Sequence, residues 1–256
     1  MLQYTAGFIG AGNMGGALLG AAKKTGEKLA VYDPDEAKAR ATGADFLQPE
    51  TLVKESRFVF LGVKPNLIES VCAGIENAVT KETVFVSMAA GVTLETLVSL
   101  LKTENIIRIM PNTPVSVGAG MVLYCCAGGV DEETEAAFLS LLQHAGRLTK
   151  TEEKLMDAGM AVSGCGPAYA YMFCEALADG AVKCGLPRDK AQLFAAQTLL
   201  GSAQMLLQSG LHPGALKDAV CSPGGATIEG VLALENANFR AAVSDAVVKG
   251  YEKVKK

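Results

Sequence analysis

Three glycines near the N-terminus have the spacing of a phosphate-binding turn. The segment GFIGAGNMGGALLG (residues 7–20) contains Gly10-x-Gly12-x-x-Gly15, after a short apolar run and before an amphipathic one. Between a strand and a helix, the first glycine permits the tight turn, the second lets the backbone approach a pyrophosphate, and the third allows close helix packing. The free N–H groups of the helix start then bind the anion. The pattern predicts a dinucleotide site; the alternative is a tight turn without a ligand.

An acidic residue, Asp33, follows the next predicted strand, about twenty residues beyond the first glycine. An acid at this place hydrogen-bonds the ribose hydroxyls of NAD and repels the extra phosphate of NADP. Asp33 therefore favours NADH, and the first basic residues after it, Lys38 and Arg40, stand farther along the next predicted helix. The alternative is that Asp33 only starts the Asp-Pro-Asp turn.

Polar or small residues also follow other predicted strands, at the edge where ligands of such sheets bind. The run FVFLGVKP (58–65) ends in Lys64-Pro65, and Lys64 either contacts a ribose or phosphate or is only solvated. Small residues end the run VFVSMAAG (84–91), where a flat ring can lie close. In the turn MPNTP (110–114), two prolines give rigidity and Asn112 can hydrogen-bond a carboxamide.

A second glycine turn opens a predicted helix near the C-terminus, where residues 220–230 read VCSPGGATIEG. The backbone N–H groups of Gly225, Ala226 and Thr227 can bind a small anion at this helix start. Ser222 can add a hydroxyl. Thr227 stands where an N-cap is expected, so its hydroxyl either caps the helix or faces a ligand.

These motifs need a scaffold that places them at one edge of a sheet. Up to about residue 125, short apolar runs alternate with amphipathic stretches, which predicts βαβ units around a parallel sheet. From Asp131 on, strand-like runs vanish and long stretches rich in Ala, Leu and Met predict helices. We expect an α/β chain with a doubly wound Rossmann-type domain at 1–150 and an all-helical domain at 151–256. The predicted strands are 6–9, 29–32, 58–63, 84–88, 106–110 and 121–126; the predicted helices are 14–24, 35–42, 94–101, 131–145, 151–184 with a break at 164–167, 189–208 and one after Thr227.

Composition argues against several classes of partner. The net charge is −4 and no basic block occurs, so the footprint of a nucleic-acid binder is absent. The uncharged run 158–174 contains three glycines and a proline and is short for a membrane span. The seven cysteines form no C-x-x-C pair, which fits neither a zinc site nor a disulfide framework, and the start lacks a signal-peptide pattern. We expect a cytoplasmic protein without a metal, nucleic acid or membrane partner.

One predicted helix is too apolar for a monomer. The stretch LFAAQTLLGSAQMLLQ (193–208) is apolar on nearly every face. A domain of about a hundred residues can hardly bury such a helix alone. We therefore expect a homodimer whose helices pack against each other across the subunits.

Seven motifs occur in one order along the chain: GAGNMG, VKP, MAAGVTLE, MPNTP, SGCGPAYAY, HPGALKD and VCSPGGATIE. Together they closely resemble pyrroline-5-carboxylate reductase, over almost the full length. That family reduces a cyclic imine with NAD(P)H in the last step of proline biosynthesis. The resemblance implies a Rossmann domain, a helical domain that interlocks with its twin, and often a ring of five dimers. Cys165 stands where the family usually has a serine, so no hydroxyl is available there.

The resemblance also implies site residues and both cofactors. The family often favours NADPH, whereas Asp33 favours NADH, so both stay open. Glu153 aligns with an acid near the proline site of the family. The predicted cofactor contacts are Gly10, Ala11, Gly12, Asn13, Met14, Gly15, Asp33, Val63, Lys64, Pro65, Ala89, Ala90, Gly91 and Asn112. The predicted substrate contacts are Glu153, Ser222, Gly225, Ala226 and Thr227.

Reduction of a C=N bond needs a hydride donor aligned with one face of the carbon and a proton on the nitrogen. A cyclic imine can arrive already protonated, so the site has to hold the carboxylate, hydrogen-bond the ring nitrogen and exclude water. Thr227 is the predicted catalytic residue, because its hydroxyl can accept from an iminium N–H or donate to the product amine. His212, before a proline, is expected to shape a turn or cap a helix.

Two other functions compete with this hypothesis. A β-hydroxyacid dehydrogenase also joins a Rossmann domain to helices, but it resembles a pattern with a catalytic lysine on the long helix after the sheet. Residues 162–171 contain no lysine, which argues against this alternative. A non-catalytic dinucleotide sensor would bind the cofactor without turnover and would have little need of Thr227.

Overall fold

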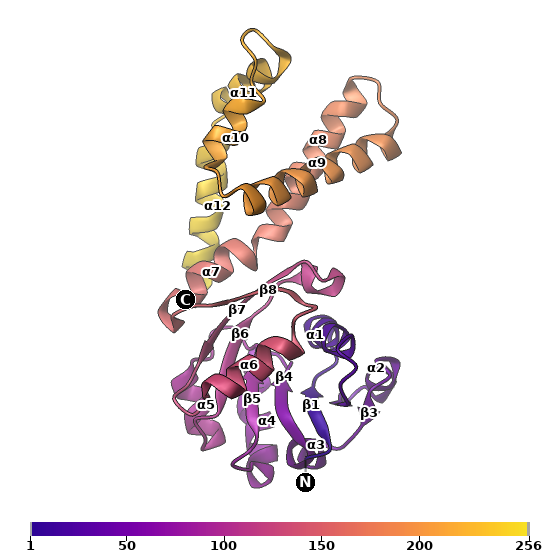
Figure 1. Cartoon of the computed structure of the whole chain (residues 1–256), viewed down its shortest axis with the longest axis vertical. Helices are drawn as coiled ribbons and strands as arrows, with labels where there is room; N and C mark the ends of the chain where they lie inside the picture. The colour runs from indigo at the N-terminus through magenta and orange to yellow at the C-terminus, as the bar shows by residue number, and fades with distance from the viewer. Residues whose placement is uncertain (1, 255–256) are drawn as a thin grey trace. The chain divides into compact units, whose positions relative to one another are not determined.

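The computed structural model describes residues 2–254, and within this range the chain forms one eight-stranded sheet (Figure 1). The strand order is β3-β2-β1-β4-β5-β6-β7-β8, so the winding reverses between β1 and β4. In open α/β sheets, ligands bind outside the carboxyl ends of the strands at this point of reversal. The strands are β1 (Tyr4–Ile9), β2 (Leu29–Tyr32), β3 (Asp45–Phe46), β4 (Ser56–Leu61), β5 (Val84–Ser87), β6 (Ile106–Met110), β7 (Gly120–Cys126) and β8 (Gly146–Lys150).

Helices connect the strands and cover both faces of the sheet. The α-helices of this part are α1 (Asn13–Lys23), α2 (Glu36–Ala41), α3 (Pro49–Glu55), α4 (Ile68–Ile75), α5 (Leu94–Leu101), α6 (Glu132–Leu141) and α7 (Met156–Ser163). Four short 3₁₀ helices are η1 (Pro65–Leu67), η2 (Glu76–Ala78), η3 (Thr113–Val117) and η4 (Glu153–Leu155).

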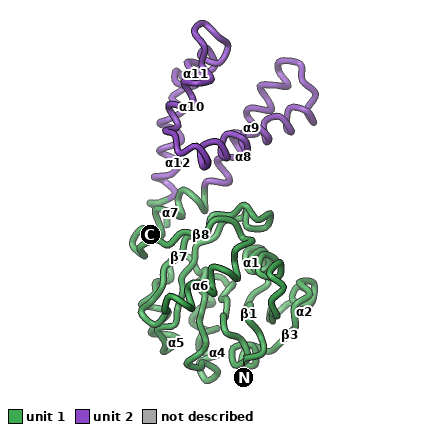
Figure 2. Tube along the Cα trace, in the orientation of Figure 1, with its two compact units in different colours: residues 1–165, 251–256 green, residues 166–250 purple. Residues whose placement is uncertain are grey.

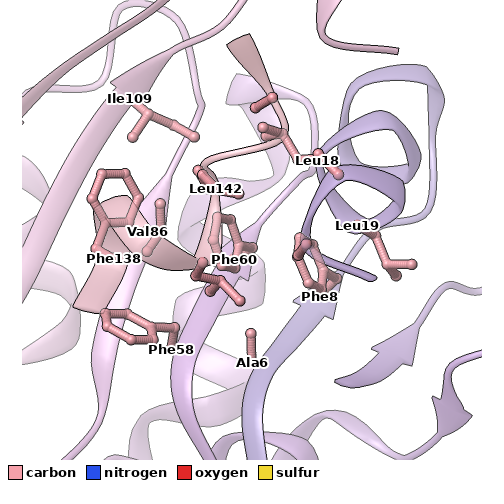
Figure 3. Close-up of a cluster of buried hydrophobic side chains, with 14 of the residues drawn as sticks. Ala6, Phe8, Leu18, Leu19, Phe58, Phe60, Val86, Ile109, Phe138 and Leu142 are labelled. Carbon is pink, nitrogen blue, oxygen red and sulfur yellow. The ribbon is translucent and has the colours of Figure 1, made fainter. Parts of the chain in front are cut away.

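Alternating side chains of the strands build two apolar cores, one on each face. Phe58 and Phe60 of β4 contact the core under α1 and α6, shown in Figure 3, while Val59 of the same strand contacts the core under α3, α4 and α5. The rings of Phe8 and Phe60 stack with their centroids 4.3 Å apart. This period of two is the consequence of the strand pleat, and it fixes the register of the central strands.

The last two strands run against the others. β1 to β6 pair in parallel, β7 pairs with β6 in antiparallel register, and β8 is parallel to β7. Only η3 lies between β6 and β7 in the chain. A connection of this length is too short for the crossover that a parallel pair requires.

The described chain divides into two compact units, residues 2–165 with 251–254, and residues 166–250 (Figure 2). The division falls after α7, later than the expected boundary at residue 150, because Met156 of α7 is buried with Leu123 of β7. The helices from this point on are α8 (Gly166–Lys183), α9 (Arg188–Ser209), α10 (Pro213–Ala219), α11 (Ala226–Asn236) and α12 (Phe239–Val254).

The second unit buries little of its apolar surface within one chain. The core cluster between α8 and α9 consists of the small residues Ala178, Ala191 and Ala195. Large apolar side chains of the same helices are more than half exposed, and a surface of this kind is typical of a protein–protein interface. They include Tyr171, Met172, Leu193, Phe194, Met205 and Leu207.

No helix within residues 2–254 combines the length and hydropathy needed to cross a bilayer. All seven cysteines are free, and burial raises the pKa of the Cys72 and Cys125 thiols to about 11.

The expected fold class is correct, and most predicted elements form within one or two residues of their expected ends. Asp131 caps α6 by accepting a hydrogen bond from the Thr134 N–H, as its position before the helix predicts. The expectation that strands end before Asp131 is wrong, because β8 follows α6. The sequence patterns also do not predict β3, α3, α4 and α10, and α11 and α12 replace the single last helix.

A hydrogen-bonded group joins α6 to β7 and β8. The Glu135 carboxylate accepts a hydrogen bond of 2.7 Å from the buried Tyr124 hydroxyl and pairs with Lys150 Nζ. The hydrogen bond from Lys150 holds the pKa of Glu135 below its ordinary value, although burial acts in the opposite direction. Burial and the bond to Glu135 raise the pKa of Tyr124.

We predict that Glu135→Gln lowers the free energy of unfolding by about 1 kcal/mol at pH 7, because an ion pair with a half-exposed lysine is lost. A carboxyl group with a lowered folded-state pKa stabilises the protein above its unfolded pKa, about 4.3. The difference between wild type and variant should therefore start to shrink as the pH falls below about 4.3 and vanish below the lowered folded-state pKa. Urea unfolding from pH 7 to pH 3 measures this, and a difference that does not change with pH would contradict it.

A matched control is Glu50→Gln on α3. Glu50 pairs with Lys54 at 3.9 Å, and both side chains are more than half exposed. This substitution should change the free energy of unfolding by less than about 0.5 kcal/mol at either pH.

Candidate active site

Contacts within the protein require two glycines of the turn between β1 and α1, Gly10 and Gly15. Gly10 has φ 104°, and a Cβ there would lie 2.5 Å from the carbonyl oxygen of Gly62, after β4. A Cβ on Gly15 would lie 2.2 Å from the carbonyl oxygen of Gly10. Both contacts are impossible for a larger residue, so these glycines let α1 start against the ends of β1 and β4.

Gly12 is different, since no protein atom requires it to be glycine. It is the N-cap of α1 with ordinary extended backbone, makes no side-chain cap bond, and an added Cβ would meet nothing within 4 Å. The first N–H groups of α1 have no partner within the helix, and Gly12 and Asn13 at this end are exposed. Open space and free donors at a helix start suit the pyrophosphate of a dinucleotide.

The carboxylate of Asp33 lies at the end of β2 and contacts this turn. Its Oδ2 accepts a hydrogen bond of 2.8 Å from the Ala11 N–H, and Oδ1 accepts one of 2.9 Å from the Asp35 N–H. The second bond is the start of the Asp-Pro-Asp turn. The structure therefore gives Asp33 a local role that leaves further lone pairs for ribose hydroxyls.

The predicted residues after β4 and β5 lie at the same edge of the sheet. Lys64 is exposed and precedes η1, which Pro65 begins, while Val63 is half-buried. After β5, Ala89 is buried, Ala90 is half-buried and Gly91 is exposed with φ 76°. The Ala89 carbonyl accepts from the Val92 N–H at 3.4 Å, which closes a short turn into α5.

Asn112, at the end of β6, uses both halves of its amide inside the protein. Oδ1 accepts a hydrogen bond of 2.8 Å from the Met121 N–H, and Nδ2 donates one of 2.8 Å to the Ser163 carbonyl. Only 9% of the residue is exposed. These bonds join the ends of β6 and α7 and leave one N–H and one oxygen lone pair of the amide, so the predicted contact of Asn112 with a carboxamide stays a prediction.

Glu153 meets a buried arginine that none of the sequence motifs contains. Arg108 of β6 is buried, and its Nη1 lies 3.1 Å from Glu153 Oε1 and its Nη2 lies 3.5 Å from Asp157 Oδ1. Glu153 Oε1 also accepts a hydrogen bond of 2.7 Å from the Leu94 N–H. A single arginine inside the apolar strand IIRIM was the available signal, because a charge is buried only with a partner.

The second glycine turn has its own geometry in the helical unit. The Gly225 N–H donates to the Ser222 carbonyl at 3.0 Å, and Gly224 has φ 67°. Proline followed by a glycine with positive φ is the pattern of a type II turn. A Cβ on Gly225 would lie 2.3 Å from Ser222 Oγ, so this hydroxyl lies directly over the helix start.

The helix start corrects two expectations. Gly225, and not Thr227, is the N-cap of α11, so Thr227 is the second residue of the helix and its hydroxyl is not the cap. The Gly225 N–H already belongs to the turn, which leaves those of Ala226 and Thr227 as donors at the open end. Both of these residues are exposed.

Other candidate groups have structural roles. His212 is the N-cap of α10 and accepts from the Gly214 N–H at 3.0 Å through Nδ1, as expected for a cap. The Tyr169 hydroxyl donates to the Ala246 carbonyl at 3.2 Å. Among the described residues, no group of three or more His, Cys, Asp and Glu side chains could hold a metal ion.

Known proteins resemble this chain over its whole length. Residues 153–256 match the family described as pyrroline-5-carboxylate reductase dimerisation, and residues 5–91 match NADP oxidoreductase, coenzyme F420-dependent. The pyrroline-5-carboxylate reductase of Escherichia coli is 43% identical, covering 100% of this chain and 98% of that protein. The enzyme of Glycine max is 40% identical over 96% of this chain and 93% of its own length.

A solved structure agrees with these relatives. The pyrroline carboxylate reductase of Plasmodium falciparum, with NADP bound, is 33% identical and superposes with a TM-score of 0.89, covering 100% of this chain and 98% of that one. The matched dimerisation region supports self-association of the helical part. From its fold, its motifs and these relatives, the chain belongs to the pyrroline-5-carboxylate reductase family of oxidoreductases.

Proposed function

We propose that this chain reduces 1-pyrroline-5-carboxylate to L-proline with a reduced nicotinamide dinucleotide, and that two open helix starts hold the two anionic groups. The observation that carries the proposal is that α1 and α11 both begin at a glycine, Gly12 and Gly225, with no side-chain cap. The side chains of Asp35, Thr93 and Asp131 cap α2, α5 and α6. The helices α3, α4, α7 and α9 also lack a side-chain cap, but the residue at their N-cap is larger than glycine. A glycine N-cap leaves the first N–H groups of the helix open to a ligand.

The turn after β1 would hold the cofactor, because its backbone fits the group. The free N–H groups of α1 would bind the pyrophosphate beside Gly12, and Asp33 would accept from a ribose hydroxyl. Lys64 is exposed at the end of β4 and can add a positive charge, while the small residues Ala89, Ala90 and Gly91 leave room for a flat ring. When bound, the reduced nicotinamide supplies the hydride that adds to the carbon of the substrate C=N bond.

The turn before α11 would hold the substrate. The N–H groups of Ala226 and Thr227 and the positive end of the helix suit a carboxylate, and Ser222 Oγ lies over the same helix start. The exposed Thr227 hydroxyl would hydrogen-bond the ring nitrogen, accepting from the iminium N–H and donating to the product amine. The substrate brings its own proton, so the chain has only to position it and exclude water.

Cofactor preference, assembly and location are parts of the same proposal. The bond of Asp33 to Ala11 holds a negative charge beside the site of the ribose, which favours NADH over NADPH. The exposed apolar side chains of α8 and α9 support a dimer through the helical unit, and a ring of dimers follows only from the family resemblance. The seven free thiols fit a cytoplasmic location.

A parallel steady-state assay with 1-pyrroline-5-carboxylate and either NADH or NADPH tests the function. We expect cofactor oxidation that depends on substrate, with proline as the product. Cofactor binding without turnover would instead support the dinucleotide sensor. Turnover of a β-hydroxyacid, with none of the imine, would support the dehydrogenase.

We predict that Gly12→Ala weakens cofactor binding by at least about tenfold, because the new methyl group would stand where the phosphates approach. The melting temperature should hardly change, since the methyl group meets no protein atom within 4 Å. Fluorescence titration of NADH and NADPH measures the affinity. Gly20→Ala on the same helix, also in open space, is the control and should bind as wild type does. Equal affinities of the two variants would refute the proposed phosphate site.

We predict that Thr227→Val lowers kcat/KM by the equivalent of about 1–3 kcal/mol, because a hydrogen bond to the reacting nitrogen is lost. Thr227→Ser keeps a hydroxyl and should retain most of the activity. Since Thr227 is exposed and is not the cap, neither variant should change the melting temperature appreciably. If the valine variant turns over as fast as the serine variant, Thr227 does not contact the nitrogen.

We predict that Asp33→Ser raises the ratio of kcat/KM for NADPH to that for NADH by about tenfold, because a charge that repels the extra phosphate is removed. Absolute affinity for both cofactors should fall, since the Ala11 N–H loses its acceptor. Asp35→Asn removes a charge from the same turn but not from the end of β2, and should shift the ratio less than about threefold. An unchanged ratio for Asp33→Ser would show that Asp33 only shapes the turn.

A further inference from the structure

The buried side chain of Arg108 in β6 contacts acidic residues at the starts of η4 and α7. The side chain of Arg108 is 4% exposed, and its backbone pairs with Ser87, the last residue of β5. The guanidinium meets two carboxylates, Glu153 Oε1 at 3.1 Å and Asp157 Oδ1 at 3.5 Å. We call these three residues the Arg108 cluster. No other charged residue occurs within β6, where all five residues are buried.

The same carboxylate oxygen holds the beginning of α5. Glu153 Oε1 accepts from the Leu94 N–H at 2.7 Å, although the two residues are 59 positions apart in the chain. Thr93, the N-cap of α5, accepts from the Thr96 N–H, so a local and a distant acceptor share the helix start. An acid at this end of a helix is also stabilised by the helix dipole.

The ion pair between Arg108 and Glu153 therefore connects the two ends of the turn at residues 88–93. Its first end is β5, whose last residue pairs with the backbone of Arg108. Its second end is α5, held by Glu153, which Arg108 holds in turn. Apolar packing joins the same segments, since Ala90 and Leu94 lie against a cluster that contains Met110 and Met156.

The Arg108 cluster is poorly suited to stabilising the fold alone. Arg108 Nε and Asp157 Oδ1 are buried and have no hydrogen-bond partner among the described residues. The two acidic side chains are each 32% exposed, whereas the guanidinium is buried. A buried charge with such unsatisfied atoms is commonly less stabilising than an apolar residue of similar size. A charged network at this place is better explained by the geometry that it imposes.

We propose that Arg108 and Glu153 are positioning residues that set the Ala89–Gly91 turn for the nicotinamide end of the cofactor. The inference rests on the proposed function, since that turn is where the cofactor ring would lie. It also gives Glu153 a role other than direct substrate contact. Loss of the acceptor at Glu153 Oε1 would free the start of α5 and let the turn move, and displacements of about 1 Å are enough to lower reaction rates strongly.

The test compares Glu153→Ala, Glu153→Gln and Arg108→Lys with wild type, using the full-length protein. Dissociation constants for NADH and NADPH are measured by fluorescence without substrate, and melting temperatures, kcat and both KM values are measured in parallel. Glu153→Ala should weaken cofactor binding and lower kcat by about tenfold, with an unchanged KM for 1-pyrroline-5-carboxylate. Glu153→Gln keeps an acceptor for Leu94 and should lose less than about threefold.

The control is Glu135→Gln, which breaks an ion pair of the same unit on α6. It should lower the melting temperature without changing cofactor affinity. Arg108→Lys keeps the charge but cannot contact two carboxylates as a fork, and should weaken cofactor binding about fivefold. It tests the proposal even if Glu153→Ala does not fold.

Three results would overturn the proposal. One is a folded Glu153→Ala variant with wild-type cofactor affinity and a lower melting temperature, which would make the cluster purely structural. Another is wild-type cofactor affinity with a raised KM for the imine, which would make Glu153 a substrate contact. The third is wild-type affinity and kcat in Arg108→Lys. Because binding is measured without substrate, failure of the proposed reaction in wild type remains a separate result.

Discussion

The structure depends on a close contact between two backbone turns. Gly10, Gly15 and Gly62 bring the β1–α1 turn against the turn after β4, and no side chain fits there, because a Cβ on Gly15 would lie 2.2 Å from the Gly10 carbonyl oxygen. This contact places the free end of α1 where the sheet winding reverses. The other predicted cofactor residues follow from it, because β2, β4 and β5 end along the same edge.

The turns before α1 and α11, which would each bind an anion, are held in place differently. At α1 the turn is fixed by the sheet, while at α11 it is fixed by Pro223 and Gly224. In both cases backbone N–H groups would hold the anion; Lys64 adds a positive charge only at the cofactor turn, and no lysine or arginine is assigned to the substrate carboxylate. This choice suits the proposed reaction, because a cation beside the substrate carboxylate would oppose the positive charge of a protonated imine. A neutral threonine hydroxyl can contact that nitrogen in either protonation state.

Much of this could be predicted from the sequence, for identifiable reasons. Buried parallel strands are continuous apolar runs, so β1, β2, β5 and β6 were found close to their true ends. β3 has two residues and β8 has a single large apolar side chain, Leu148, too little for a periodic signal. Asn112 and Glu153 stand out in the sequence as polar residues, but the bonds that they make depend on Ser163 and Arg108, which are distant in the chain. Local patterns cannot show pairings that only tertiary folding creates.

The central proposal is that the start of α1 binds the cofactor pyrophosphate and the start of α11 binds the substrate carboxylate. Its most direct test is a crystal structure of the protein with NADPH or NADH and proline. We predict pyrophosphate oxygens about 2.7–3.2 Å from the N–H groups that begin α1, beside Gly12. We also expect the proline carboxylate at the same range from the N–H groups of Ala226 and Thr227, with the Thr227 hydroxyl on the ring nitrogen. A proline carboxylate bound by a lysine or arginine side chain, away from α11, would contradict this arrangement.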